Sequence, residues 1–184
     1  MFLINEIILF LAADIVFMQA FGTSELLVSA GNRKKSFFTS VLITLFTSVG
    51  SVMAYFANGL LPEKYSDLKI FCYVLVSGML CTVSLKILSL AGNEKFSEYR
   101  NCIYISAFGN AVIGTFFTVS EKSSGIGEYF SAGLTSGLGF AAASLILSAA
   151  YRKLTSVKVP AAFRGFPAIL VYLGVVSMAV YALK

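Results

Sequence analysis

The chain has 184 residues, of which 58% are hydrophobic and 12% are charged, and its formal net charge is +5. Soluble domains need more polar residues to cover their surface, so this composition excludes a soluble globular protein and predicts a chain surrounded by lipid. The sequence has no histidine, which excludes histidine-based acid/base catalysis, and its three cysteines are dispersed, which excludes a self-contained Cys/His metal site.

Six apolar stretches each approach the roughly 20 residues that a helix needs to cross the hydrocarbon core of a bilayer. They cover about 2–21, 36–58, 69–91, 101–120, 128–151 and 165–183. Backbone polar groups in lipid must be paired within the protein, and these stretches are too long for barrel strands, so they predict helices. We expect an all-α integral membrane protein of six transmembrane helices, with residues 1–184 forming a single membrane domain.

The first stretch is expected to be a retained helix and not a cleaved signal, because no basic region precedes it and it contains Glu6 and Asp14. Asp14 lies mid-span, where a carboxylate costs a few kcal/mol unless it is protonated, paired or facing water. We therefore expect Asp14 to face protein. It is either part of an ion or proton path or a hydrogen-bonded residue at a subunit interface.

The connections between the stretches differ in charge. The first, third and fifth hold most of the Lys and Arg residues between spans, among them Lys34, Arg100 and Arg152, whereas the second and fourth hold few. Basic connections face the cytoplasm, so this pattern places both termini outside the cytoplasmic membrane of a bacterium or archaeon. Orientation thereby explains the positive charge, and we expect no nucleic-acid partner.

An internal repeat links the two halves of the chain. Ala-Phe-Gly-Thr at 20–23 resembles Ala-Phe-Gly-Asn at 107–110, 87 residues later, and Phe-Phe-Thr-Ser at 37–40 resembles Tyr-Phe-Ser-Ala at 129–132, 92 residues later. Three spans per copy is an odd number, so the second copy is expected to be inverted relative to the first. Repeat 1 covers about 1–91 and repeat 2 about 100–184.

The middle helix of each expected repeat carries small residues at four-residue spacing. These are Ser40, Thr44 and Ser48 in one helix and Gly133, Gly137 and Ala141 in the other. Small side chains let helix backbones approach closely in a bilayer. We interpret these two stripes as packing surfaces and not as a functional site.

Both Phe-Gly sequences are followed by polar residues within otherwise apolar spans. Thr23, Ser24 and Glu25 follow the first, and Asn110 follows the second. Glycine with polar neighbours at membrane depth is typical of a broken helix, and broken helices line the sites of inverted-repeat proteins. The alternative for the first copy is that residues 23–25 end the first span, with Thr23 or Ser24 as a cap. For Asn110 we favour a functional or packing role.

The segment before the last stretch carries a more specific pattern. Residues 159–165 read Val-Pro-Ala-Ala-Phe-Arg-Gly and include Pro160, Phe163, Arg164 and Gly165. This segment resembles the Val-Pro-x-x-Phe-Arg-Gly sequence before the last span of the A subunit of the Rnf electron-transport complex and of its counterpart, the E subunit of the sodium-pumping NADH:quinone oxidoreductase (Nqr). The six spans, the outward N-terminus and the inverted repeat are similar to that family over essentially the whole chain.

In that family each broken helix carries one cysteine. These two join two cysteines of a homologous, oppositely oriented subunit (Rnf E or Nqr D type) to hold a [2Fe-2S] cluster in the membrane. The resemblance puts Ser24 and Asn110 at the two cysteine positions. A hydroxyl or an amide is a poor substitute for thiolate at iron, and Cys72, Cys81 and Cys102 match neither position. The resemblance implies the scaffold and the complex, but we expect no cofactor held by this chain's own residues.

Three functions are open on the sequence. The first is a divergent membrane subunit of an Rnf/Nqr-type ion-translocating electron-transport complex, which pairs with the homologous subunit beside flavin-carrying membrane subunits. The second is a small-molecule or ion transporter built on the same inverted repeat, with Asp14, Ser24, Glu25 and Asn110 lining its site. The third is a redox-silent architectural subunit.

Overall fold

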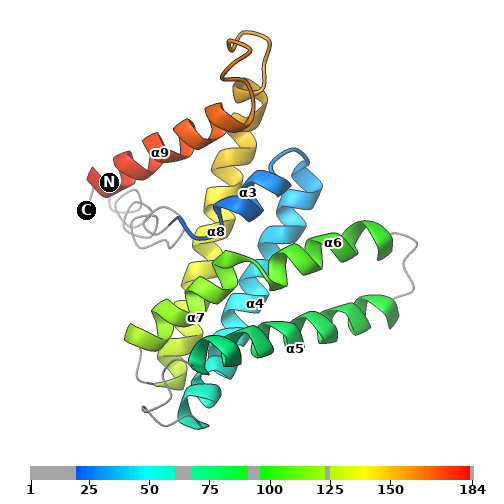
Figure 1. Cartoon of the computed structure of the whole chain (residues 1–184), viewed down its shortest axis with the longest axis vertical. Helices are drawn as coiled ribbons and strands as arrows, with labels where there is room; N and C mark the ends of the chain where they lie inside the picture. Colours follow the sequence, from blue (N-terminus) through cyan, green and yellow to red (C-terminus); the bar gives the residue numbers. More distant parts are fainter. Residues whose placement is uncertain (1–19, 61–67, 91–95, 123–124, 183–184) are drawn as a thin grey trace.

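The computed structural model describes residues 20–60, 68–90, 96–122 and 125–182, and the regular structure in these ranges is helical throughout (Figure 1). In chain order the helices are α3 (Thr23–Ser29), α4 (Arg33–Leu60), α5 (Leu68–Leu90), α6 (Phe96–Ala107), α7 (Asn110–Lys122), α8 (Ile126–Leu154) and α9 (Phe166–Ala182). Asp14 and most of the first expected span lie outside the described residues.

Four stretches are long and apolar enough to cross a membrane: Arg33–Leu60, Leu68–Leu90, Tyr99–Glu121 and Ile126–Leu154. They coincide with the second to fifth expected spans, and the third of them is interrupted between α6 and α7. The last expected span is the shorter apolar helix α9, which has 17 residues. The prediction of an all-helical chain with helices suited to a membrane is therefore confirmed for the described residues.

Large apolar side chains cover much of the outer surface of these helices. Phe71 on α5, Leu145 on α8 and Met178 on α9 are each more than half exposed. In water, a surface with so many exposed large apolar side chains would be unfavourable, whereas in a bilayer it faces hydrocarbon. The outer surface therefore fits lipid as the surrounding solvent.

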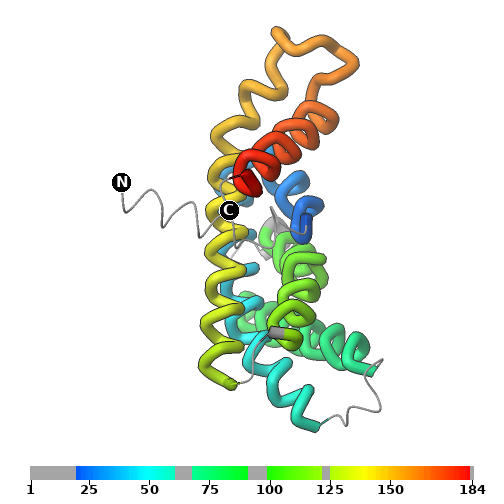
Figure 2. Tube along the Cα trace, turned by 90° about the vertical axis from the view of Figure 1, so that its left-hand side faces the viewer, coloured from blue at the N-terminus to red at the C-terminus, as the bar shows by residue number. Residues whose placement is uncertain are grey.

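Helices α4 and α8 form the central pair of the fold and run antiparallel alongside each other (Figures 1 and 2). A Cβ placed on Gly133 would lie 2.5 Å from the carbonyl oxygen of Thr47, and one on Gly137 would lie 2.5 Å from the Cα of Thr44. Both distances are far below van der Waals contact, so the two backbones meet with no side chain between them. The interpretation of the small-residue stripes as packing surfaces is confirmed at these positions.

Most of the buried hydroxyl groups of α4 are paired within their own helix. Ser40, Thr47 and Ser51 each donate to the carbonyl oxygen four residues earlier, at 2.8, 2.9 and 2.6 Å. Between the two helices, the hydroxyls of Ser36 and Ser144 share a hydrogen bond of 2.7 Å. These residues can lie in an apolar environment at little cost, because each keeps a hydrogen bond in the absence of water.

The first and fifth basic connections come together at one end of the α4–α8 pair. Gly31, just before α4, lies against the side chain of Tyr151, near the end of α8. The ring centroid of Tyr99, near the start of α6, lies 4.5 Å from that of Phe38 on α4. The start of α4 and the end of α8 therefore share one end, whereas α6 begins beside the first turns of α4 and runs across the pair (Figure 1). Which side of the membrane this end faces stays a prediction.

Replacing Gly137 by alanine is expected to destabilise the α4–α8 contact. The added Cβ would meet the backbone of Thr44, which cannot rotate aside as a flexible side chain does. We expect a loss of about 1–3 kcal/mol of stability, measured as a lower Tm of the purified protein in detergent. Gly174→Ala is the matched control, because Gly174 lies within α9 and a Cβ there meets nothing within 4 Å. Equal effects of the two changes would contradict this account of the packing.

Candidate functional site

The fourth expected span is broken at its Phe-Gly sequence. Helix α6 ends at Ala107 and α7 begins at Asn110, with Phe108 and Gly109 between them. The break frees backbone groups that a continuous helix would pair, and the hydroxyl of Ser77 on α5 donates to the freed carbonyl oxygen of Ala107. A break at membrane depth needs such a partner, because lipid offers none.

The first Phe-Gly sequence also directly precedes a helix. Gly22 has a φ of +85°, a left-handed conformation that glycine adopts without strain, and α3 begins after it at Thr23. The Thr23 hydroxyl donates back to the carbonyl oxygen of Ala20 at 3.1 Å. This bond does not cap α3, because Thr23 is the first residue of the helix and its hydroxyl donates to a carbonyl oxygen, whereas a capping side chain accepts from a backbone amide.

The two interruptions lie against each other. A Cβ on Gly22 would lie 2.9 Å from the Cβ of Ala111, in the first turn of α7. A Cβ on Gly109 would overlap the carboxyl group of Glu25, in the first turn of α3. In each interruption, the glycine is therefore the residue that lies against the other interruption.

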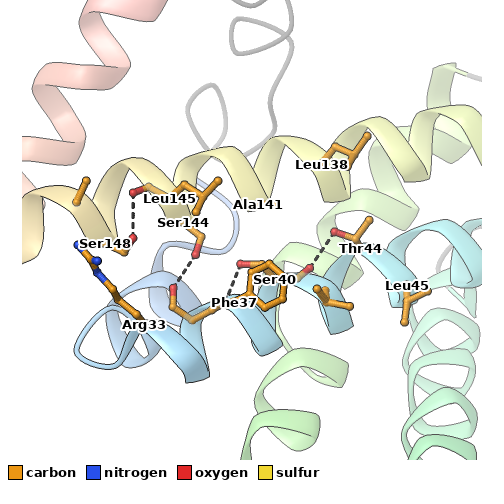
Figure 3. Close-up of a pocket in the computed structure, with 13 residues that line it drawn as sticks. Arg33, Phe37, Ser40, Thr44, Leu45, Leu138, Ala141, Ser144, Leu145 and Ser148 are labelled. Atoms are coloured by element: carbon orange, nitrogen blue, oxygen red, sulfur yellow. Dashed lines mark hydrogen bonds between the residues drawn. The ribbon is translucent and has the colours of Figure 1, made fainter.

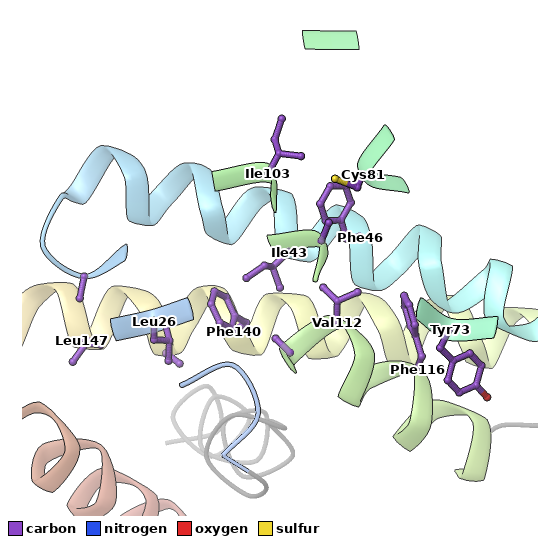
Figure 4. Close-up of a cluster of buried hydrophobic side chains, with 14 of the residues drawn as sticks. Leu26, Ile43, Phe46, Tyr73, Cys81, Ile103, Val112, Phe116, Phe140 and Leu147 are labelled. Atoms are coloured by element: carbon purple, nitrogen blue, oxygen red, sulfur yellow. The ribbon is translucent and has the colours of Figure 1, made fainter. Parts of the chain in front are cut away.

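A third close contact joins the ring of Phe21 to Gly114 on α7, where a Cβ would overlap the ring. Around these contacts lies a cluster of buried apolar side chains that includes Leu26, Val112 and Phe140 (Figure 4). The interruptions are thus packed into the core, and the glycines at 22, 109 and 114 are needed for that packing.

Glu25 is buried beside this contact, with 2% of its surface exposed. The Ser24 hydroxyl donates to its Oε2 at 2.6 Å. A buried carboxyl group needs partners of this kind to offset the loss of water. A cavity of about 280 Å³ adjoins Glu25, and its polar lining residues are Ser29, Lys35, Thr39 and Asn101.

The sequence patterns did not identify Thr39 and Asn101 as neighbours of the Glu25 cavity. Thr39 belongs to α4 and Asn101 to α6, so only the tertiary fold brings them to the same cavity. The one sequence feature that could have indicated these residues is a polar side chain near the start of an apolar stretch. The end of a membrane helix accounts for such a side chain equally well. No pattern in the sequence separates these two possibilities.

Ser24 and Asn110 lie at the surface, whereas their neighbours Glu25 and Gly109 are buried. The Ser24 hydroxyl is bonded to Glu25, and the Asn110 amide has no hydrogen-bond partner among the described residues. The structure therefore brings Glu25 into the interior and leaves Ser24 and Asn110, the two positions at which the resemblance predicts cysteine, facing outward.

The residues at the interruptions do not fit an iron–sulfur cluster, because a hydroxyl and an amide lack the thiolate that binds iron. Cys72 and Cys81 lie on α5, and Cys102 lies on α6 at the wall of the Glu25 cavity. In the ranges that the structure describes, no three His, Cys, Asp or Glu side chains are grouped to hold a metal ion. We therefore assign no electron-transfer step to Ser24 or Asn110.

The Val-Pro-Ala-Ala-Phe-Arg-Gly segment forms a compact turn between α8 and α9. The Arg164 guanidinium donates to two backbone carbonyls of the same connection at 3.1 and 3.2 Å. The backbone amides of Phe163 and Arg164 donate to the carbonyl oxygen of Pro160 at 2.9 and 3.0 Å. Gly165 ends the turn with a φ of +87°. Within the chain, Pro160, Arg164 and Gly165 shape this turn, and Phe163 is exposed.

No family model and no curated protein matches the sequence. The resemblance to the Rnf and Nqr subunits therefore rests on the residues of this chain alone. The contact between the two interruptions does not depend on a comparison with other proteins. The two Phe-Gly sequences, 87 residues apart in the chain, lie against each other in this structure.

The contact between the interruptions is expected to give strong coupling between Gly114 and Phe21. Gly114→Ala alone should cost about 1–3 kcal/mol of stability, because its Cβ overlaps the Phe21 ring. In a Phe21→Ala background the same change should cost much less, since alanine lacks the ring atoms and the Cγ that the added Cβ would overlap. The measurement is a double-mutant cycle on thermal or denaturant unfolding in detergent.

The control for this cycle pairs Gly114→Ala with Phe71→Ala. Phe71 lies exposed on α5, so the two effects should add. Additive effects for Gly114→Ala with Phe21→Ala would show that Phe21 and Gly114 are not in contact.

Proposed function

We propose that this chain is a membrane subunit of an Rnf/Nqr-type ion-translocating electron-transport complex. In this proposal it pairs with a homologous, oppositely oriented six-helix subunit beside flavin-carrying membrane subunits. It lies in the cytoplasmic membrane of a bacterium or archaeon with both termini outside. The observation that carries the proposal is the direct contact between the two Phe-Gly interruptions, each of which stands at the start of a helix.

The contacts at the interruptions support two inverted three-helix repeats. At the 87-residue offset of the Phe-Gly sequences, the contact of Gly22 with Ala111 corresponds to one of Gly109 with Ser24. Gly109 lies against Glu25, one residue further along the chain. Contacts that nearly reproduce themselves when the halves are exchanged are expected for copies related by a two-fold axis.

Helices α4 and α8 support the same relationship. At the 92-residue offset, Thr44 corresponds to Ser136 and Gly137 to Leu45, so the contact of Thr44 with Gly137 maps to within one residue of itself. The two helices are antiparallel and have 28 and 29 residues. An axis passing near this contact would relate repeat 1, about 1–91, to repeat 2, about 100–184.

The exposed positions at the interruptions support a partner subunit. The Asn110 amide is exposed at a break within an otherwise apolar span and has no hydrogen-bond partner among the described residues. In a bilayer such an amide is unfavourable unless protein covers it. A homologous subunit at this surface would supply the cover. The role of the chain in the complex is then structural, and electrons pass without using Ser24 or Asn110.

The Glu25 cavity favours a second candidate function, an ion or small-molecule transporter. A buried carboxylate beside a cavity of about 280 Å³ with polar walls is the kind of site that binds a solute within a membrane. This function would use Glu25 and its neighbours in place of a redox partner. The two candidates differ in what accompanies the chain when it is purified.

The proposal predicts co-purification. The full chain, tagged and isolated in a mild detergent, should bring with it flavin-carrying membrane subunits and a second six-helix subunit. Mass spectrometry of the isolated proteins and flavin fluorescence of the complex are the measurements, and a membrane protein of another class with the same tag is the control. A stable homodimer that binds a solute and carries no flavin would refute the proposal and support the transporter.

Within the isolated complex, Ser24→Ala should leave any iron–sulfur signal unchanged. The Ser24 hydroxyl bonds to Glu25, and neither group is a thiolate. Electron paramagnetic resonance and iron content are the readouts, and the yield of co-isolated subunits controls for assembly. Loss of the iron–sulfur signal with normal assembly would show that Ser24 contributes to a cluster after all.

A further inference from the structure

A long groove runs between α4 and α8, with a volume of about 620 Å³ (Figure 3). Its edges are large apolar side chains that are well exposed, including Phe37 and Leu45 on α4 and Leu145 on α8. Small buried residues such as Ser40 and Ser144 line its base. The groove therefore exposes an apolar surface to the surrounding bilayer.

The polar atoms in the base of the groove are already paired. The hydroxyls of Ser40 and Thr44 donate to carbonyl oxygens of α4 at 2.8 Å, and the Ser36 and Ser144 hydroxyls bond to each other (Figure 3). These hydroxyls therefore need no hydrogen bond from a ligand. The interior of the groove is thus suited to a hydrocarbon chain and not to a polar solute.

The length of the groove selects among hydrocarbon occupants. From Arg33 to Leu45 along α4 the rise is about 18 Å, and from Leu138 to Ala149 along α8 it is about 17 Å. One leaflet of a bilayer accounts for about 15 Å of its ~30 Å hydrocarbon core. The groove therefore spans a single leaflet, which matches one acyl chain, whereas a transmembrane helix of another subunit would need a surface that spans both leaflets.

Arg33 stands at the basic end of this groove. Figure 3 shows its side chain extending from α4 toward Ser148 on α8. Arg33 is exposed and has no hydrogen-bond or ion-pair partner among the described residues. Lys34 and Arg152 lie at the same end of the helix pair. A guanidinium at the membrane interface, surrounded by further positive charge, attracts the phosphate of an anionic lipid.

We propose that the groove between α4 and α8 is a binding site for an anionic phospholipid. Arg33 pairs with the lipid phosphate, and one acyl chain lies along the groove as far as Leu45 and Leu138. The lipid completes the apolar surface of the α4–α8 pair. This site requires only that the chain lies in a membrane, and it is independent of the electron-transport proposal.

The test uses the full chain, with any subunits that accompany it, incubated with vesicles of palmitoyl-oleoyl phosphatidylglycerol and phosphatidylethanolamine in equal amounts. Native mass spectrometry then measures the lipids retained. The protein should keep one phosphatidylglycerol in preference to phosphatidylethanolamine. Arg33→Gln should lower that preference about fivefold, the factor expected for one basic residue near the membrane surface. Ala141→Leu, which fills the groove, should remove the retained lipid.

Two matched variants control for the positions of these changes. Lys69→Gln removes a basic residue at the start of α5 that does not line the groove, and Thr135→Leu enlarges an exposed α8 residue outside it. Both should retain lipid as the unchanged protein does. A thermal melt of each variant reports whether it is folded, and Arg33→Gln alters only an exposed side chain.

Three results would overturn the proposal. The first is equal retention of the two lipids by the unchanged protein, and the second is retention by folded Ala141→Leu at the unchanged level. The third comes from a photo-cross-linking residue in place of Leu138, in the protein within its native membrane. If that residue captures a segment of another protein and no lipid, the groove is a protein interface.

Discussion

The close approach of α4 and α8 at Gly133 and Gly137 is the constraint on which the rest of the fold depends. In a bilayer, burial of apolar surface does not drive helices together, so association relies on van der Waals contact and hydrogen bonds. Two backbones that meet without side chains between them gain more van der Waals contact than two helices held apart by long side chains. Helices α3, α5, α6 and α7 all pack against α4, so the position of each is fixed relative to this pair.

The spans and their packing stripes were predictable because they depend on local composition. An apolar run of about 20 residues has few alternatives to a membrane helix, and glycines at four-residue spacing mark one face whatever lies opposite. The direction of single side chains at the interruptions was not predictable. Ser24 points outward and Glu25 points inward because the left-handed turn at Gly22 sets how α3 is rotated about its axis. That rotation cannot be read from the order of polar and apolar residues.

The interruptions have a reason to exist that does not involve a cofactor. Gly22 and Gly109 each occupy a space in which the other half of the molecule leaves no room for a Cβ. The Ser77 hydroxyl donates a hydrogen bond to the Ala107 carbonyl oxygen, which the second break leaves without a backbone partner. A broken-helix scaffold can therefore be maintained by packing alone, whatever residues stand at Ser24 and Asn110 on its surface.

The internal pairing of the α4 hydroxyls bears on how the protein is made. Ser40, Thr47 and Ser51 are bonded to their own helix, so α4 does not need α8 to satisfy them. The bonds that do join the two helices lie toward the two ends of α4, between Ser36 and Ser144 and between Asn58 and Tyr129. During synthesis α4 can thus leave the translocon and enter the lipid before α8 is made, because the hydroxyls in its middle are already hydrogen-bonded within the helix.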